Sequence, residues 1–116
     1  MHLDAFRDHV LALPDATEDQ PFGPDTLVFR VGARIFALLA LDAASVNLKC
    51  DPEEAVALRE RYADVQPGYH MNKAHWNTVG LQGGVPAAEI RAMADASYAL
   101  VRAGLPRAAR DALGAV

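Results

Sequence analysis

The sequence predicts an α+β fold, with an antiparallel β-sheet and helices packed on one of its faces. Three observations lead to this prediction: a short amphipathic helix opens the chain, a block of β-rich runs joined by tight turns follows, and a capped helix and a long helix come later. Strands joined directly by hairpins favour antiparallel pairing over a doubly wound parallel sheet. With 116 residues and no internal repeat, residues 1–116 are expected to form a single domain.

The first helix is predicted over residues 3–13, where apolar side chains follow helical spacing. Pro14 ends the pattern, because proline cannot continue a helix from the interior. We expect Phe6 and Val10 to lie in the core rather than to contact a ligand.

A polar edge strand is expected over residues 15–20, which are mostly acidic and polar. Residues 21–26 then combine two prolines, a glycine and an aspartate, which is turn chemistry. We expect Phe22 to fill the core beneath this turn.

Two β-rich runs, residues 27–31 and 34–41, are separated only by Gly32 and Ala33. This spacing predicts a hairpin in which Gly32 supplies the positive φ of a tight turn. Residues 45–49 alternate strictly between apolar and polar side chains, so they are predicted to form a third antiparallel strand with one solvated face.

The start of a second helix, over residues 52–62, is the strongest local signal in the chain. Asp51 can cap it, Pro52 fits the first helical position, and Glu54 completes a capping-box pattern. Its apolar positions are Val56, Leu58 and Tyr62.

The last third of the chain predicts a strand over residues 76–81 and then a long helix from Pro86 to about Ala103. A short tail, residues 106–113, is expected to add one or two helical turns. The buried stripe of the long helix is expected to comprise Ile90, Met93, Ala94, Ser97, Leu100 and Val101.

Composition narrows the function classes. The net charge of −4 opposes strong sequence-independent DNA binding, because neutralisation of phosphates supplies most of that affinity. Any nucleic-acid role must therefore come from a local patch. The single Cys50 excludes an intramolecular disulfide and favours a cytoplasmic location. No apolar run approaches the about 18 residues needed to span a bilayer, so no membrane partner is expected.

Catalytic and metal-binding patterns are weak. His70 and His75 are five residues apart, which matches neither one helix face nor one strand face, and no acid lies between Asp64 and Glu89. We predict no metal site and no cofactor. Cys50 could have a lowered thiol pKa before a helix N-terminus, but a strand-end cysteine is more often an inert apolar residue.

Residues 67–79, PGYHMNKAHWNTV, are the candidate binding segment. Lysine and histidine side chains donate to phosphates, amides read polar edges, and Tyr69 and Trp76 offer faces for stacking. The same Trp76 opens an apolar strand, where a core anchor is the commoner role, so both interpretations stay open. The predicted nucleic-acid-binding residues are Lys49, Arg59, Arg61, His70, Asn72, Lys73, His75, Trp76 and Asn77.

A family resemblance runs through most of the chain. Its strongest parts are the runs PFGPDTLVFRVGARIFALL, VNLKCDPEEA and PGYHMNKAHWNTV, followed by SYALV and GLPR. This pattern resembles the MmcQ/YjbR family of small bacterial proteins from Leu3 to about Ala109. The resemblance implies a CyaY-like α+β fold, and family members are commonly described as DNA-binding by analogy with a double-wing arrangement of strands. It implies no catalytic residue, and Ala74 stands where a second Lys or Arg is frequent.

We therefore predict a non-enzymatic DNA-binding protein that acts as a monomer or a weak homodimer. The alternative is a module that binds a protein or a small anionic ligand, with no nucleic-acid role, which the net negative charge favours. A third hypothesis is an enzyme that uses His70 or His75 as an acid–base group, although no paired acid or nucleophile supports it.

Overall fold

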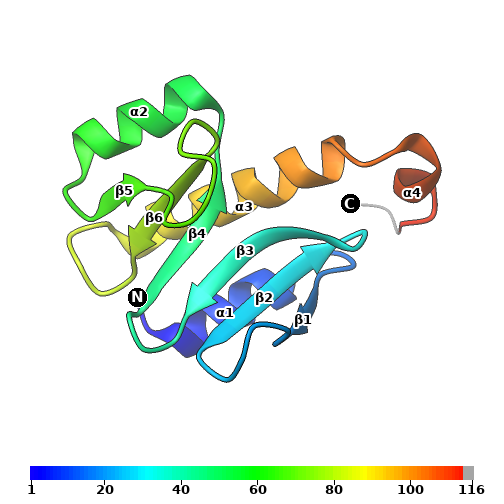
Figure 1. Cartoon of the computed structure of the whole chain (residues 1–116), viewed down its shortest axis with the longest axis horizontal. Coiled ribbons are helices and arrows are strands. Elements are labelled where there is room, and N and C mark those ends of the chain that lie inside the picture. The colour runs from blue at the N-terminus through cyan, green and yellow to red at the C-terminus, as the bar shows by residue number, and fades with distance from the viewer. Residues whose placement is uncertain (114–116) are drawn as a thin grey trace.

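The computed structural model describes residues 1–113, and Figure 1 shows its arrangement. In chain order the elements are α1 (Leu3–Leu11), β1 (Thr17–Asp19), β2 (Thr26–Val31), β3 (Arg34–Ala40), β4 (Ser45–Lys49), α2 (Pro52–Arg61), β5 (Val65–Pro67), β6 (Trp76–Gly80), α3 (Ala87–Ala103) and α4 (Arg107–Asp111). The predicted order of helices and strands is confirmed.

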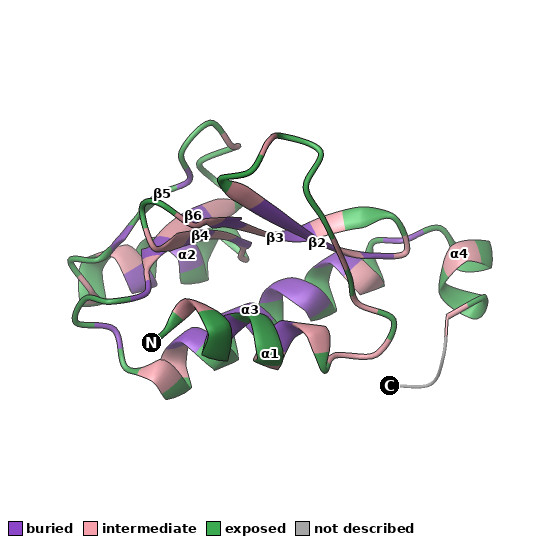
Figure 2. Cartoon of the chain, turned by 90° about the horizontal axis from the view of Figure 1, so that it is seen from below, coloured by how far each residue is buried: buried purple, intermediate pink, exposed green. Residues whose placement is uncertain are grey.

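The strands form one six-stranded sheet in the order β1-β2-β3-β4-β6-β5, and every neighbouring pair is antiparallel. Helices α1 and α3 cover one face, whereas the loops that precede β2 and β6 rise over the other (Figure 2). We call these the helical face and the outer face. The α+β class is confirmed, and the CyaY-like likeness stays a prediction.

The core lies between the sheet and the helices, because alternate residues of each strand point to the helical face. Phe6 and Val10 of α1 are fully buried, as predicted. Phe6 meets Phe29 edge to face at 6.2 Å between ring centroids, and Phe36 meets Tyr98 of α3 in the same manner at 5.4 Å. These ring pairs join α1 and α3 to the strands β2 and β3.

The β2–β3 hairpin and the edge strand β1 are both confirmed. Gly32 and Ala33 have φ values of 55° and 67°, and two positive φ values in succession are what a two-residue type I′ turn requires. Gly32 was expected to adopt this conformation, whereas Ala33 does so despite its Cβ. The neighbouring strand β1 occupies the edge of the sheet and pairs only with β2.

The start of α2 follows its local signals, but one of its predicted apolar positions, Val56, is not buried. The Asp51 carboxylate accepts hydrogen bonds from the amides of Glu53 and Glu54 at 3.2 and 3.4 Å, so the predicted Asp51 cap is confirmed. Within residues 1–113, the Glu54 side chain does not accept a bond from the Asp51 amide, so the predicted capping box is only half formed. Val56 was placed on the buried side and is instead 45% exposed, because Ala55 and Leu58 supply the buried side of α2. Within residues 1–113, no helix combines the length and apolarity needed to cross a membrane.

The long helix α3 buries most of its predicted stripe. Leu100 is the exception, since it is 39% exposed. Tyr98 takes its place in the core, where its ring packs on Phe36 and its hydroxyl donates to the carbonyl of Pro14 at 2.6 Å. Helical periodicity therefore predicted every buried position of α3 except Tyr98, which is buried through its contact with Phe36.

Phe22 does not fill the core, and that prediction is wrong. Its side chain is 65% exposed. The loop that carries it, residues 20–25, passes over the outer face of the sheet (Figure 2), so Phe22 cannot reach a core that lies on the helical face. The short strand β5 was not predicted separately, because its three residues, Val65–Pro67, gain their strand geometry by pairing with β6.

Ser97 of α3 joins the two central strands from the helical face. Its hydroxyl accepts from the amide of Lys49 at 2.8 Å and donates to the carbonyl of Phe36 at 2.6 Å. The β3–β4 ladder ends at the pair Ala37 and Leu48, so this hydroxyl bonds the two backbone groups next in line. The predicted structural role of Ser97 is consistent with its complete burial.

Candidate nucleic-acid interface

The candidate segment forms the β5–β6 loop, which we define as residues 68–75, and the start of β6. The loop closes where the amide of Gly68 donates to the carbonyl of Trp76 at 2.8 Å. A Cβ atom at Gly68 would lie 2.8 Å from the Cβ of Trp76 and 2.9 Å from its carbonyl oxygen. Glycine is therefore required at this position, because a side chain would force the two strand ends apart.

The β5–β6 loop is folded by its own hydrogen bonds. The side-chain oxygen of Asn72 accepts from the amide of Ala74 at 3.0 Å. The backbone carbonyl of Asn72 accepts from the amide of His75 at 3.2 Å. The Lys73 ammonium donates to the carbonyl of Gly68 at 3.0 Å. Two predicted contact residues, Asn72 and Lys73, therefore also hold the shape of the loop.

Tyr69 is anchored by its backbone and leaves its ring in solvent. Its amide donates to Thr78 Oγ1 at 3.0 Å, and its carbonyl accepts from Asn47 Nδ2 at 3.3 Å. Tyr69 is 69% exposed, and its ring contacts the His70 ring in a tilted arrangement, with 4.0 Å between the centroids and 52° between the ring planes. His70 has a φ of 57°, a left-handed conformation that histidine adopts more readily than most residues.

Thr78 and Asn47 also hydrogen-bond to each other. These two residues anchor the loop, and the sequence analysis did not single them out. Their signal was available in the alternation of β4 and β6, which places both side chains on the outer face as direct cross-strand partners.

Lys49 and Trp76 are cross-strand partners at the adjoining ends of β4 and β6. Both side chains leave the outer face, because Leu48 and Asn77 occupy the helical face. Trp76 is half-buried and lies outside the core cluster, so the core-anchor interpretation is wrong. The amide of Cys50 donates to the carbonyl of His75 at 2.8 Å, which attaches the end of β4 to the loop.

Arg59 connects α2 to the loop from the helical face. One guanidinium nitrogen donates to Asn77 Oδ1 at 2.9 Å and to the carbonyl of Lys73 at 3.2 Å. The Asn77 amide nitrogen donates in turn to the carbonyl of Ala55 at 3.2 Å.

The predicted nucleic-acid contact by Asn77 is therefore wrong. Its side chain is only 2% exposed. It follows Trp76 by one residue in β6, and consecutive strand residues point to opposite faces. Asn77 consequently belongs to the helical face and fastens α2.

Arg61 is exposed but does not continue the same surface. It follows Arg59 by two residues, which is about 200° around a helix. Its guanidinium lies 5.2 Å from the centroid of the Tyr62 ring. The structure therefore brings Lys49 together with the loop and leaves Arg61 on another side of α2.

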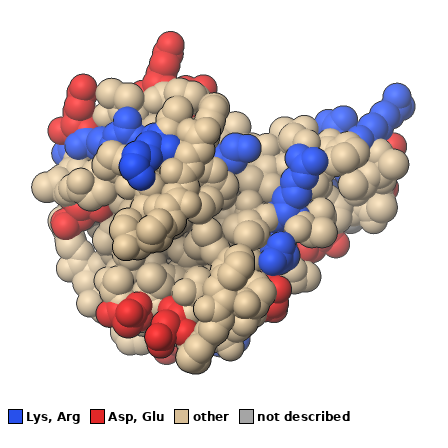
Figure 3. Space-filling model, viewed as in Figure 1, with Lys and Arg blue, Asp and Glu red and all other residues tan. Residues whose placement is uncertain are grey.

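Charge is unevenly distributed around the loop. No acidic residue occurs between Asp64 and Glu89, so the loop and β6 carry only cationic and neutral side chains. Figure 3 shows Lys and Arg atoms gathered over α2 and the adjoining loop. Acidic atoms lie beyond α2 at the upper rim of this view and along the lower edge of the molecule. We define the basic loop surface as Lys49, Tyr69, His70, Asn72, Lys73, His75 and Trp76.

The structure brings together few groups for catalysis or metal binding. Among residues 1–113, no three His, Cys, Asp or Glu side chains are close enough to hold a metal ion. Burial, followed by the negative charges of Glu54 and Asp51, raises the pKa of the Cys50 thiol above its ordinary value. The thiol is therefore protonated near neutral pH, which agrees with the inert interpretation of this residue and not with a lowered pKa.

Comparison with known proteins gives consistent matches. A family model described as YjbR matches residues 11–100. The chain is 36% identical to protein YbdF of Escherichia coli O157:H7 over 99 residues, which is 84% of this chain and 81% of that protein. It is 50% identical to protein YjbR of Escherichia coli K12 over 54 residues, which is 47% of this chain and 46% of that protein.

Solved structures match in fold as well. Protein DR2400 of Deinococcus radiodurans, described as a DUF419 domain, has a TM-score of 0.87 and 38% identity, covering 94% of this chain and 85% of that one. A protein from Pseudomonas syringae has a TM-score of 0.77 and 32% identity, covering 87% and 99% respectively. None of these names states an activity.

Proposed function

The chain belongs to the YjbR family, and we propose that it is a cytoplasmic, non-enzymatic DNA-binding protein that uses the basic loop surface. The observation that carries the proposal is the exposed Tyr69 ring, held on a loop whose only charged side chain, Lys73, is a cation. The outer face beside this loop carries no helix, because α1 and α3 cover the other side.

Two lysines would supply the phosphate contacts. The Lys49 ammonium makes no hydrogen bond or ion pair with any residue in the range 1–113, so it is available to a phosphate. The Lys73 ammonium would exchange its bond to the Gly68 carbonyl for a charge-assisted bond to a phosphate oxygen. Such contacts position DNA without reading its sequence.

Tyr69 would add a stacking contact. Its ring has a tilted contact with the His70 ring and is otherwise exposed to solvent, so it is open to an incoming base. Stacking of a base on an aromatic side chain contributes about 1–3 kcal/mol and tolerates any sequence. The surface therefore fits a weak, general DNA contact better than sequence-specific recognition.

The net charge of −4 sets the expected strength of binding. Repulsion between the acidic remainder of the protein and DNA lowers the affinity, and added salt screens the few phosphate contacts. We expect dissociation constants of about 10–100 µM at low salt, which is the range of non-specific binding.

Fluorescence anisotropy with a labelled DNA of about 20 nucleotides, single-stranded and duplex, tests the proposal over about 20–200 mM salt. Lys49→Ala and Lys73→Ala should each weaken binding about threefold and lower the salt slope by about 1. Arg107→Ala is the matched control, because Arg107 is an exposed cation of α4, at the far end of the molecule in Figure 1.

Two results would contradict the DNA proposal. One is the absence of binding to either form of DNA at the lowest salt. The other is an equal loss of affinity in Arg107→Ala and Lys49→Ala, which would show attraction to the whole protein rather than to the basic loop surface.

A protein or a small anion remains the second candidate, and two exposed rings favour the protein. Phe22 and Tyr69 are 65% and 69% exposed, and their loops rise over the same outer face (Figure 2). Exposed aromatic side chains are typical of protein interfaces. If phosphate or a protein stabilises the fold in a thermal-shift assay while DNA does not, this alternative replaces the first.

A further inference from the structure

We propose that a pocket on the helical face, between α2 and α3, binds a small organic cation: a primary ammonium ion attached to a branched or cyclic aliphatic body. Of the basic loop surface, only Lys49 also lines this pocket, and the occupant of the pocket has the opposite charge to DNA. The inference therefore does not depend on the proposed function.

The pocket is a half-open apolar space lined by the sheet, α2 and α3. Leu48 and Val79 of the sheet form its floor, Leu58 faces it from α2, and Met93 faces it from α3. Each of these four side chains is itself buried from the surrounding solvent. The pocket has a volume of about 120 Å³, so it is larger than the space that one water molecule needs.

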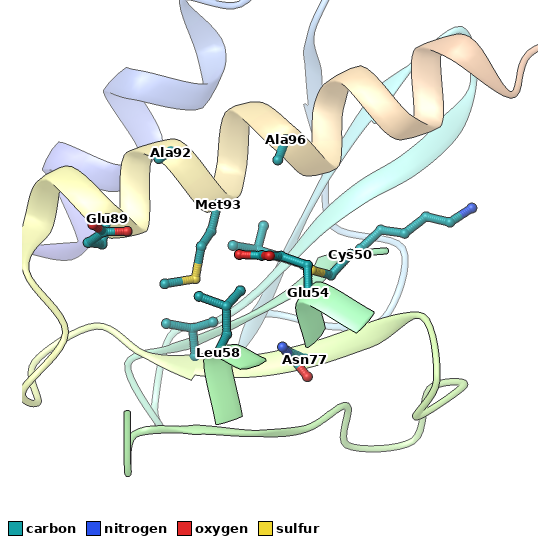
Figure 4. Close-up of a pocket in the computed structure, with 11 residues that line it drawn as sticks. Cys50, Glu54, Leu58, Asn77, Glu89, Ala92, Met93 and Ala96 are labelled. Atoms are coloured by element: carbon teal, nitrogen blue, oxygen red, sulfur yellow. The ribbon is translucent and has the colours of Figure 1, made fainter. Parts of the chain in front are cut away.

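Two carboxylates stand at the pocket and come from different helices. Glu54 belongs to the first turn of α2, and Glu89 lies one helical turn before Met93 on α3. Figure 4 shows Glu54 reaching toward α3, with Cys50 beside it. Within residues 1–113, neither carboxylate takes part in an ion pair or a side-chain hydrogen bond.

The charges around the pocket select a cation. Lys49 is its one cationic lining residue, so the lining side chains carry a net charge of −1. Lys49 also leaves the opposite face of β4 from Leu48. An ammonium ion at the mouth would be attracted by the two glutamates, whereas a carboxylate or phosphate would be repelled by them.

The size of the pocket limits the rest of the ligand. An apolar cavity of about 150 Å³ accommodates benzene, so a pocket of about 120 Å³ suits a body of about five or six carbons. The aliphatic part would contact Leu58 and Met93 while the ammonium stays near the partly solvated carboxylates. A ligand this small is expected to bind with a millimolar dissociation constant.

Cys50 provides a built-in reporter of occupancy. It lines the pocket and is the single cysteine of the chain, so any cysteine alkylation by iodoacetamide occurs at this position. A ligand seated in the pocket should cover the thiol and slow its alkylation. The signal does not require any activity of the protein.

The experiment measures Cys50 alkylation and the unfolding temperature with three matched probes at millimolar concentration. These are 3-methylbutylamine, the neutral 3-methylbutanol and the anionic 4-methylpentanoate. We expect the amine to slow alkylation at least threefold and to raise the unfolding temperature. The alcohol and the carboxylate should have smaller effects or none.

Variants locate the effect. Glu54→Gln and Glu89→Gln should each weaken amine protection about two- to fivefold, as expected for partly exposed charge pairs. Glu53→Gln is the matched control, because Glu53 is an exposed neighbour on α2 that does not line the pocket. All rates are compared with the ligand-free rate of the same variant, since Glu54 also affects the thiol itself. Ala96→Leu should abolish protection by filling the pocket mouth, which Ala96 lines.

The proposal is overturned if the alcohol or the carboxylate protects Cys50 as well as the amine does. It is also overturned if the Glu54→Gln and Glu89→Gln double variant retains full protection. Loss of amine binding would leave DNA binding by Lys49 and Lys73 unaffected, so the two functions fail independently.

Discussion

The outer and helical faces of β4 and β6 differ sharply although the same strands build both. Lys49 and Trp76 are paired on the outer face, and Leu48 and Asn77 are paired on the helical face. The outer pair lies beside an exposed loop held by backbone and side-chain hydrogen bonds. The helical pair borders a pocket that α2 and α3 also line.

This difference separates stability from recognition. The outer-face side chains of β4 and β6 are half-buried, so their removal should change binding more than folding. Polar side chains on the helical face, such as Ser97 and Asn77, hydrogen-bond to other groups there. Removing them leaves those donors and acceptors without partners. The following substitutions test that division, from the largest expected effect to the smallest.

Ser97→Ala should cost about 3 kcal/mol of unfolding free energy, because it leaves the amide of Lys49 and the carbonyl of Phe36 unsatisfied. Denaturant unfolding measures the change. Ser45→Ala, at the outer face of β4, should cost less than about 0.5 kcal/mol. Equal losses in the two variants would contradict the role assigned to the Ser97 hydroxyl.

Gly68→Ala should destabilise the protein by about 2 kcal/mol, since the new Cβ would overlap the Cβ and carbonyl of Trp76. Thermal unfolding measures the loss. Gly84→Ala is the control, because its Cβ would meet only Asp64 Oδ2, at an ordinary 3.7 Å. If both variants unfold at the same temperature, closure of the β5–β6 loop does not require glycine at position 68.

Asn77→Ala should cost about 1.5 kcal/mol, because the Arg59 guanidinium loses its side-chain partner and α2 loses its link to β6. Asn72→Ala, on the exposed loop, should be milder in stability. Chemical denaturation compares the pair. A larger loss of unfolding free energy in Asn72→Ala than in Asn77→Ala would contradict the assignment of stability to the helical face.

Cys50 should show the smallest effect, a change in reactivity of about two- to threefold. Its raised pKa reduces the thiolate fraction at neutral pH, so alkylation should keep rising with pH beyond the range where an ordinary cysteine levels off. Glu54→Gln removes a negative charge that raises this pKa, and alkylation at pH 7.5 should become faster than in Glu53→Gln. A slower rate would contradict the direction of the shift.

Local elements were predictable because their signals are short-range. Asp51 and Pro52 begin α2 through contacts within one helical turn, and Gly32 lies in a two-residue turn. Phe22 was misplaced because hydrophobicity says that a side chain prefers burial but not which face its loop crosses. Val65–Pro67 became a strand only through its pairing with β6.

The candidate site was predictable as a segment but not as a surface. The run of residues 67–79 contains the exposed ring, one lysine and both histidines that the structure places around one loop. It also contains Asn77, which points to the opposite face. The two carboxylates of the pocket are 35 positions apart in sequence, and no local pattern links them.

The sequence by itself determined the order of helices and strands, the caps and turns, and the concentration of cations and rings in one acid-free segment. These follow from backbone preferences and from interactions across a few residues. Only the tertiary structure decided which side chains share a face, because that depends on strand pairing and on how α2 and α3 pack against the sheet. Strand pairing therefore directed the side chains of Lys49 and Asn77 to opposite faces, and long-range packing brought Glu54 to the same pocket as Glu89.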